Sequence, residues 1–295
     1  MKNNISGVGV ALVTPFDRQG KVDLNALEIL VDRTIQGGVD YLVVLGTTAE
    51  TATLTEAEKQ TVITCISQVN ARRVPMVIGI GGNNTAAVEA QIRAFDFTPF
   101  DAVLSVTPYY NKPSQEGMYQ HYLRIAEASP VPVILYNVPG RTGVNLQPQT
   151  VLRLAEATDR IIAVKEASGQ LSQAAYILRD RPEGFRVISG DDNLTLPMVA
   201  LGGDGVISVA ANAFPRMFCR MVHAAQQGNM AEAAALHLRM METVDALFAE
   251  GNPTGVKAAL AHYGVMENHL RLPLVAASDT LSRRIAELID RNELE

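Results

Sequence analysis

The sequence predicts a (β/α)8 barrel, followed by a helical C-terminal region. Eight short runs of aliphatic and β-branched residues recur along the chain. Each run is followed by turn residues and a helix-like stretch, and no long structureless loop lies between them. The runs are nearly continuous in apolar character, which is typical of strands buried on both faces. The expected strands are Val8–Thr14, Tyr41–Leu45, Met76–Ile80, Ala102–Thr107, Val133–Asn137, Ile161–Lys165, Arg186–Ser189 and Gly205–Val209.

The stretches between these runs carry recognisable helix starts. Thr55-Glu56-Ala57-Glu58 has the form of a capping box, and Asn84 can cap a helix that begins at Thr85. Pro148 stands where a first-turn proline belongs. An open, doubly wound sheet is the alternative, but it would have about five or six strands and a glycine-rich phosphate loop after the first. The first run ends instead in Thr14-Pro15-Phe16.

The last part of the chain shows no further strand-like run. From about Ala213 onward it reads as several helices, including the long Ala-, Leu- and Met-rich stretch Met230–Glu250. We therefore expect residues 1–212 to form the barrel core and residues 213–295 to form a helical region packed on the barrel. Whether this region is a domain of its own stays open at this point.

Composition excludes several classes of function. The chain has 295 residues, 47% of them hydrophobic, and a formal net charge of −6, so it lacks the basic face of a nucleic-acid-binding protein. The two cysteines, Cys65 and Cys219, make neither a disulfide framework nor a zinc site. The N-terminus lacks an apolar signal region and no apolar run reaches about 18 residues, so we expect a cytoplasmic protein without membrane contact. The histidines show no metal-ligand spacing, and no metal is expected; they are His121, His223, His237, His262 and His269.

Lys165 is the strongest candidate for catalysis. It follows Ile161-Ile162-Ala163-Val164 at the end of an expected buried strand, and active sites of such barrels lie at the C-terminal ends of the strands. Desolvation favours the neutral amine, which is a nucleophile toward a carbonyl group such as that of a small keto acid. The alternative is a lysine that pairs with Glu166 or extends out of the barrel mouth.

Other strand ends carry candidate partners for Lys165. Tyr136 could shuttle protons in Schiff-base chemistry, or be a core aromatic residue with a satisfied hydroxyl. Gly46-Thr47-Thr48 offers hydroxyls and turn amides that suit a carboxylate, or is an ordinary strand-to-loop turn. Arg141 could bind a second carboxylate bidentately, or form a surface salt bridge. Tyr110 follows the fourth expected strand.

The chain resembles the dihydrodipicolinate synthase / N-acetylneuraminate lyase family along essentially its full length, and five motifs between residues 46 and 192 match in order. One departure is Ala49, where many members have glycine. The motifs are Gly46-Thr47-Thr48-Ala49-Glu50, Thr107-Pro108-Tyr109-Tyr110-Asn111-Lys112-Pro113, Tyr136-Asn137-Val138-Pro139-Gly140-Arg141-Thr142-Gly143, Val164-Lys165-Glu166-Ala167 and Ser189-Gly190-Asp191-Asp192.

The resemblance implies a lyase that condenses pyruvate with L-aspartate 4-semialdehyde to 4-hydroxy-tetrahydrodipicolinate, in lysine and diaminopimelate biosynthesis. It implies a homotetramer built as a dimer of tight dimers, and no cofactor. By the family pattern, Lys165 forms the Schiff base, while Tyr136, Thr47 and Tyr110 form a proton relay in which Tyr110 reaches the neighbouring subunit's site.

The family pattern also implies the binding residues. Thr47 and Thr48 hold the pyruvate carboxylate, Arg141 holds that of the semialdehyde, and the backbones of Gly190 and Ile207 line the pocket near the lysine. A pyruvate-releasing sugar-acid lyase of the same family is the nearest alternative, and a catalytically silent binding protein is another.

The resemblance also bears on feedback by lysine. The positions that match the histidine and the glutamate of the lysine-sensitive pattern are Lys59 and Ala87, while Asn83 and Tyr109 are retained. A fixed positive charge near a cationic ligand is unfavourable, so we expect weak or no inhibition by lysine.

Overall fold

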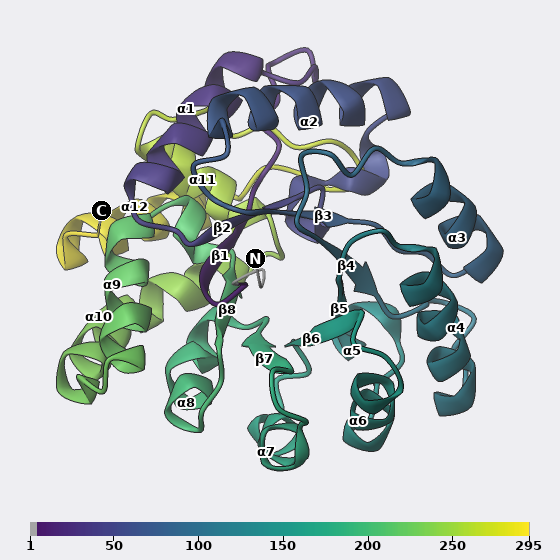
Figure 1. Cartoon of the computed structure of the whole chain (residues 1–295). Helices are drawn as coiled ribbons and strands as arrows, with labels where there is room; N and C mark the ends of the chain where they lie inside the picture. Colours follow the sequence, from purple (N-terminus) through teal and green to yellow (C-terminus); the bar gives the residue numbers. More distant parts are fainter. Residues whose placement is uncertain (1–4, 295) are drawn as a thin grey trace. The chain divides into compact units, whose positions relative to one another are not determined.

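The computed structural model describes residues 5–294 of the chain, and it contains eight parallel strands in a closed barrel (Figure 1). The strands follow one another in the order of the chain, which confirms the predicted fold class. They are β1 Gly7–Ala11, β2 Tyr41–Val44, β3 Met76–Gly79, β4 Ala102–Val106, β5 Val133–Asn137, β6 Ile161–Glu166, β7 Arg186–Ser189 and β8 Gly205–Ser208.

The helices begin where the capping signals predict. Thr55 and Glu58 form the capping box, Asn84 accepts a hydrogen bond from the amide of Ala87, and Pro148 opens its helix. The α-helices are α1 Leu24–Gln36, α2 Glu56–Asn70, α3 Thr85–Ala94, α4 Gln115–Ala128, α5 Pro139–Thr142, α6 Pro148–Ala157, α7 Leu171–Asp180, α8 Thr195–Ala200, α9 Pro215–Gln226, α10 Met230–Phe248, α11 Thr254–His262 and α12 Asp279–Asn292. The 3-10 helices are η1 Thr47–Ala49, η2 Thr51–Thr53, η3 Asp192–Leu194 and η4 Ala210–Asn212.

Contacts divide the chain into two compact units. The first consists of Pro75–Ile207 with the short segment that ends at Ser6, and the second consists of Gly7–Val74 with the segment that begins at Ser208. The division expected from the sequence, with a barrel core that ends at Asn212 and a helical region after it, follows the order of the chain and not its contacts. It stays a prediction.

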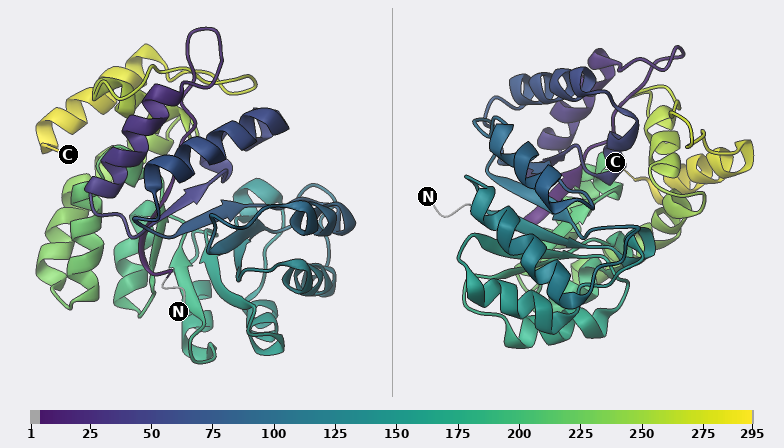
Figure 2. Two further views of the ribbon diagram at one scale, coloured as in Figure 1. Left: turned by 45° about the horizontal axis from the view of Figure 1, so that its top comes forward. Right: turned by 90° about the vertical axis from the view of Figure 1, so that its right-hand side faces the viewer.

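The first unit contains the strands from β3 to β7, each paired in parallel with the next along the chain. Helices α3, α4, α6 and α7 lie along the outside of these strands (Figures 1 and 2). In β5 and β6, Tyr136 is paired with Lys165 and Asn137 with Glu166. Because side chains alternate along a strand, this register decides which residues of the two strands share a face.

The second unit contains β1 and β2, helices α1 and α2, and the C-terminal helices α9 to α12. Gly9 of β1 is paired with Tyr41 of β2, and a Cβ atom at Gly9 would lie 2.1 Å from the Tyr41 ring. Only glycine therefore leaves room for this buried ring. Helix α9 packs on β1 and on α10, and α12 packs on α10 and α11.

A half-exposed ion pair joins α9 to the start of β1. The carboxylate of Asp40 accepts hydrogen bonds from the amide of Val8 at 2.7 Å and from Nε2 of His223 at 2.8 Å. This hydrogen bond with Asp40 raises the pKa of His223 above its usual 6.5. The pair therefore contributes stability only while the imidazole is protonated.

We expect the substitution His223→Gln to lower stability chiefly at acidic pH. Since the pKa of His223 is raised in the folded state, the contribution is complete below pH 6.5 and disappears as the pH rises through the raised pKa. Allowing for solvent screening, the loss is up to about 1 kcal/mol, or roughly 2–4 °C in the thermal midpoint. Thermal unfolding at about pH 5.5 and about pH 8.5 measures it.

His237 on α10 is the matched control. Burial lowers its pKa, so its protonation below pH 6.5 opposes folding. The substitution His237→Gln should therefore raise the midpoint relative to the parent protein at acidic pH, the opposite sign. Parallel pH profiles for the parent and the His223→Gln variant would contradict the role of the pair.

Candidate active site

Lys165 and Tyr136 lie side by side on paired strands. The side chain of Lys165 is 6% exposed, and its Nζ atom lies 4.2 Å from the centre of the Tyr136 ring. Tyr136 is also buried. Both residues stand near the carboxyl ends of their strands, β5 and β6, as the sequence predicts. An ammonium or amine over the face of a phenol is held by the electrons of the ring, and the phenol is near enough to exchange protons with groups attached to the nitrogen.

The amine of Lys165 forms no ion pair at close range. In the part of the chain that the structure describes, no carboxylate lies within 4.0 Å of it and its Nζ atom forms no hydrogen bond with the protein, while the charge of Asp191 interacts with it from farther away. The alternative in which Lys165 pairs with Glu166 is therefore wrong. Buried lysines are scarce and normally paired, because an isolated ammonium is costly to remove from water. An unpaired lysine at a strand end is therefore suited to act as a nucleophile.

Glu166 belongs instead to a buried polar network behind the lysine. Its carboxylate accepts hydrogen bonds from Nδ2 of Asn137 at 3.0 Å, from Nε2 of Gln173 at 2.9 Å and from the amide of Ser168 at 2.7 Å. The side chain of Asn137 also accepts a hydrogen bond from the amide of Leu146 at 2.9 Å. The network thus fixes β5 and β6 to α7 and to the segment after α5.

The sequence reasoning missed this network. Its signal was an acidic residue directly after Lys165 at the end of an apolar strand, with Asn137 in the neighbouring strand. A charged side chain inside such a strand needs several donors when it is buried.

Gly190 gives the stem of Lys165 its space. A Cβ atom there would lie 2.4 Å from Cβ of Ala167 and 3.0 Å from Cε of Lys165. Ile207, in β8, is fully buried and follows Val206, which is paired with Ser189 at the end of β7. In the following turn, burial raises the pKa of Asp191, and the nearby charge of Lys165 opposes that rise.

Arg141 is free to bind an anion. It lies on the four-residue helix α5 and is exposed, and no acid or carbonyl among the described residues pairs with its guanidinium group. The helix itself is anchored, since the Thr142 hydroxyl donates to the carbonyl of Val138 at 3.2 Å and accepts from Thr107 at 3.3 Å. The surface salt bridge that was the alternative for Arg141 is therefore not formed.

Tyr110 extends away from the single chain. Its side chain is 88% exposed, and its backbone has the left-handed φ of 72°, which is unusual for a bulky residue. Its amide donates to the carbonyl of Thr142 at 3.4 Å, and Asn83 donates to the neighbouring carbonyl of Tyr109 at 3.2 Å. These contacts hold a large aromatic side chain in the solvent.

Thr47 and Thr48 belong to the second unit, where they form helix η1. The hydroxyl of Thr48 accepts a hydrogen bond from Nδ2 of Asn252 at 2.9 Å, whereas Thr47 is exposed. Asn252 lies 204 residues away along the chain, and sequence reasoning did not find it. Ala49 lies in the 3-10 helix without a positive φ, so the departure from glycine at this position causes no strain.

The described residues contain neither a metal site nor a membrane span. Residues 5–294 hold no group of three or more His, Cys, Asp or Glu side chains that could bind a metal ion. Over the same range, no helix combines the length and the apolar character needed to cross a bilayer.

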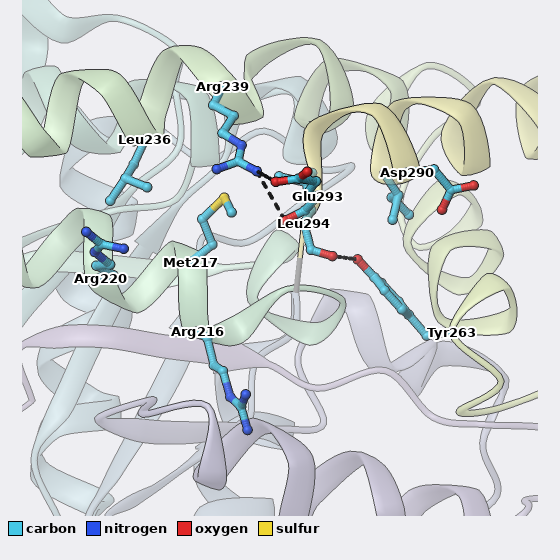
Figure 3. Close-up of a pocket in the computed structure, with 10 residues that line it drawn as sticks. Arg216, Met217, Arg220, Leu236, Arg239, Tyr263, Asp290, Glu293 and Leu294 are labelled. Carbon is cyan, nitrogen blue, oxygen red and sulfur yellow. Dashed lines mark hydrogen bonds and ion pairs between the residues drawn. The ribbon is translucent and has the colours of Figure 1, made fainter.

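A cleft of about 700 Å³ lies among the C-terminal helices of the second unit (Figure 3). Its arginines already have partners: Arg220 pairs with Glu232, and Arg239 pairs with Glu293 and with the carbonyl of Asn292. The hydroxyl of Tyr263 donates to a backbone carbonyl. The cleft contains none of the residues that the sequence singles out, so we do not assign the chemistry to it.

Comparison with known proteins identifies the family. The model of the dihydrodipicolinate synthetase family matches residues 4–292. The 4-hydroxy-tetrahydrodipicolinate synthases of Flavobacterium psychrophilum and Parabacteroides distasonis are 53% and 51% identical to the chain; the alignments cover 95% and 97% of the chain and 95% and 96% of the relatives. The crystal structure of dihydrodipicolinate synthase from Thermotoga maritima is 37% identical, with a TM-score of 0.96 over 99% of this chain and 100% of that one. The chain therefore belongs to the dihydrodipicolinate synthetase family.

Proposed function

We propose that the protein condenses pyruvate with L-aspartate 4-semialdehyde to 4-hydroxy-tetrahydrodipicolinate, on the route to diaminopimelate and lysine. The observation that carries this proposal is the buried, unpaired amine of Lys165 against the ring of Tyr136. The relatives that are about half identical to this chain are named for this synthase. A sugar-acid lyase of the same family is not favoured, because none of these relatives has that name.

The chemistry begins at Lys165. Its neutral amine attacks the ketone carbon of pyruvate, and the resulting carbinolamine loses water to give an imine. Loss of a proton from the methyl group gives an enamine, whose terminal carbon attacks the aldehyde of the second substrate. The amino group of that substrate then attacks the imine carbon, closes the ring and releases Lys165. The protonated imine is itself the electron sink, so the sequence of steps requires no metal or organic cofactor.

Tyr136, Thr47 and Tyr110 are proposed to move the protons of these steps. The ring of Tyr136 lies 4.2 Å from the nitrogen, and a phenol can return the proton that the carbinolamine needs to lose water. Tyr110 would act in the site of a neighbouring subunit, which agrees with its exposure in the single chain.

Binding of the two carboxylates is divided between separate residues. Thr47 and Thr48 would hold that of pyruvate, through hydroxyls and turn amides. Arg141 would hold that of the semialdehyde bidentately, and its free guanidinium group supports this role. The backbones of Gly190 and Ile207 would line the pocket beside the lysine.

The assembly and the cellular location remain proposals of ours. We propose a homotetramer made of two tight dimers, in the cytoplasm. One solved relative is described as a monomeric variant of dihydrodipicolinate synthase; it is 37% identical, with a TM-score of 0.96 over 100% of this chain and 99% of that one. Weak or no inhibition by lysine also stays a prediction.

Reduction with borohydride in the presence of pyruvate should attach the substrate covalently to Lys165. Mass spectrometry of the digested protein locates the adduct, since reduction converts the imine into a stable amine. The variant Lys112→Met is the control and should still be labelled. An adduct on Lys112 or Lys257, with Lys165 unmodified, would contradict the mechanism.

The substitution Arg141→Ala should separate the two half-reactions. Trapping of pyruvate should be largely unchanged, while condensation should fall by about 30- to 1000-fold, because a charge-assisted bidentate contact contributes about 2–4 kcal/mol. A coupled assay with both substrates measures the second step. Arg124 forms a surface pair with Glu89, so Arg124→Ala is the matched control and should keep both steps. Equal loss of both steps in Arg141→Ala would make Arg141 structural.

Mixing two inactive variants tests whether Tyr110 acts across a subunit boundary. Tyr110→Phe and Lys165→Ala subunits, dissociated and reassembled together, should regenerate sites that hold both native residues. Activity should return to a measurable fraction of that of the parent protein. If mixed oligomers form and no activity returns, Tyr110 acts in its own subunit or has no role.

A further inference from the structure

Lys257 on α11 forms a fully buried ion pair with Glu50, the residue that follows helix η1. Its Nζ atom lies 2.5 Å from a carboxylate oxygen of Glu50, and neither side chain is exposed to solvent. Nζ also donates to the carbonyl of His269 at 2.9 Å and lies 4.3 Å from the centre of the Phe16 ring. The other carboxylate oxygen of Glu50 accepts from the amide of Arg271 at 3.0 Å. The pair is therefore fixed on all sides.

The turn that carries Thr47 and Thr48 has left-handed residues on both sides. Leu45 has a φ of 55° and Glu50 a φ of 53°, conformations that a non-glycine residue adopts only when its surroundings hold it there. The carboxylate of Glu50 is held by the ion pair with Lys257 and by the amide of Arg271. The geometry of the two threonines thus depends on a conformation that the turn would not keep by itself.

We propose that Lys257 is a positioning residue for pyruvate: through Glu50 it keeps Thr47 and Thr48 in the arrangement that binds the substrate carboxylate. The inference rests on the proposed function, because it uses the role given there to the two threonines. It gives the C-terminal helical region a part in catalysis, although Lys257 itself touches no substrate.

A buried ion pair such as Lys257–Glu50 contributes more to the orientation of the carboxylate than to the stability of the fold. Removing two charges from water costs about as much as their attraction returns, so an apolar pair of the same size would stabilise the fold at least as well. Burial also lowers the pKa of Lys257 to about 8, against the opposing charge of Glu50. What the apolar pair would not supply is direction, because the ammonium of Lys257 and the backbone amide of Arg271 engage the two carboxylate oxygens of Glu50 and fix its orientation.

Three variants test the proposal: Lys257→Met, Glu50→Gln and the double variant. The readout is the pyruvate concentration that half-saturates borohydride trapping on Lys165, which does not involve the second substrate. Lys257→Met leaves a buried carboxylate without its partner and should raise this concentration about tenfold or more. The double variant, with neither charge, should recover the thermal midpoint relative to Lys257→Met but still require about tenfold more pyruvate than the parent protein, because removing both charges relieves the unpaired carboxylate without restoring its direction. Half-saturation by the semialdehyde should change less than about twofold in all three.

Val244→Ala is the matched control for stability. It truncates a buried side chain of α10 in the same helical region without removing a charge. It should lower the thermal midpoint and leave half-saturation by pyruvate unchanged. If Lys257→Met is not folded, Glu50→Gln supplies the same readout, because it breaks the same pair with a side chain of equal shape.

Thr48→Val separates failure of the inference from failure of the proposed function. If Thr48→Val weakens pyruvate binding and folded Lys257→Met or Glu50→Gln does not, the inference is wrong and the proposed function stands. If the double variant recovers the half-saturation by pyruvate of the parent protein, the direction supplied by the ion pair is not needed and the inference is wrong as well. If Thr48→Val has no effect, the role of the turn in the proposed function is wrong, and the inference falls with it.

Discussion

The register between β5 and β6 is the constraint on which the rest of the candidate site depends. It pairs Tyr136 with Lys165 on one face and Asn137 with Glu166 on the other. Because successive side chains point to opposite faces, a shift by one residue would exchange the lysine and the glutamate. The polar network around Glu166 opposes such a shift, since it would leave a carboxylate without its donors. The register of β5 and β6 thus places the polar network on one face of the sheet and the amine of Lys165 on the other.

Much of this arrangement could be predicted from the sequence, because it depends on local signals. Strands buried on both faces are visible as apolar runs, and a lysine at the end of such a run stands out as a candidate functional residue. The ends of strands are less visible. The first strand ends at Ala11 and not at Thr14, because the amide of Val13 turns to the side chain of Asn212. The sixth continues to Glu166, because that residue finds its donors behind the sheet.

The contacts that hold Thr48 and Glu50 could not be predicted in the same way. Asn252 and Lys257 are about 200 residues away along the chain, and no local pattern pairs residues over such a separation. Lys257 did carry a signal, since it stands between apolar residues in Gly255-Val256-Lys257-Ala258-Ala259-Leu260. A lone cation in such a run indicates burial, and a buried cation outside an active site is normally paired with an acid. Which acid it is follows only from the fold.

Lys165, the proposed nucleophile, and Arg141, the proposed ligand of the semialdehyde carboxylate, are held by different kinds of structure. Lys165 stands in a strand that is paired on both sides, whereas Arg141 stands on a four-residue helix in a connecting segment. Segments of this kind tolerate replacement better than central strands do. A lineage, or a protein engineer, could therefore exchange the aldehyde partner by rewriting residues 139–143 while the imine-forming step is inherited unchanged. Because the two residues stand on separate elements, the aldehyde that is accepted can change during evolution while the step that activates pyruvate stays the same.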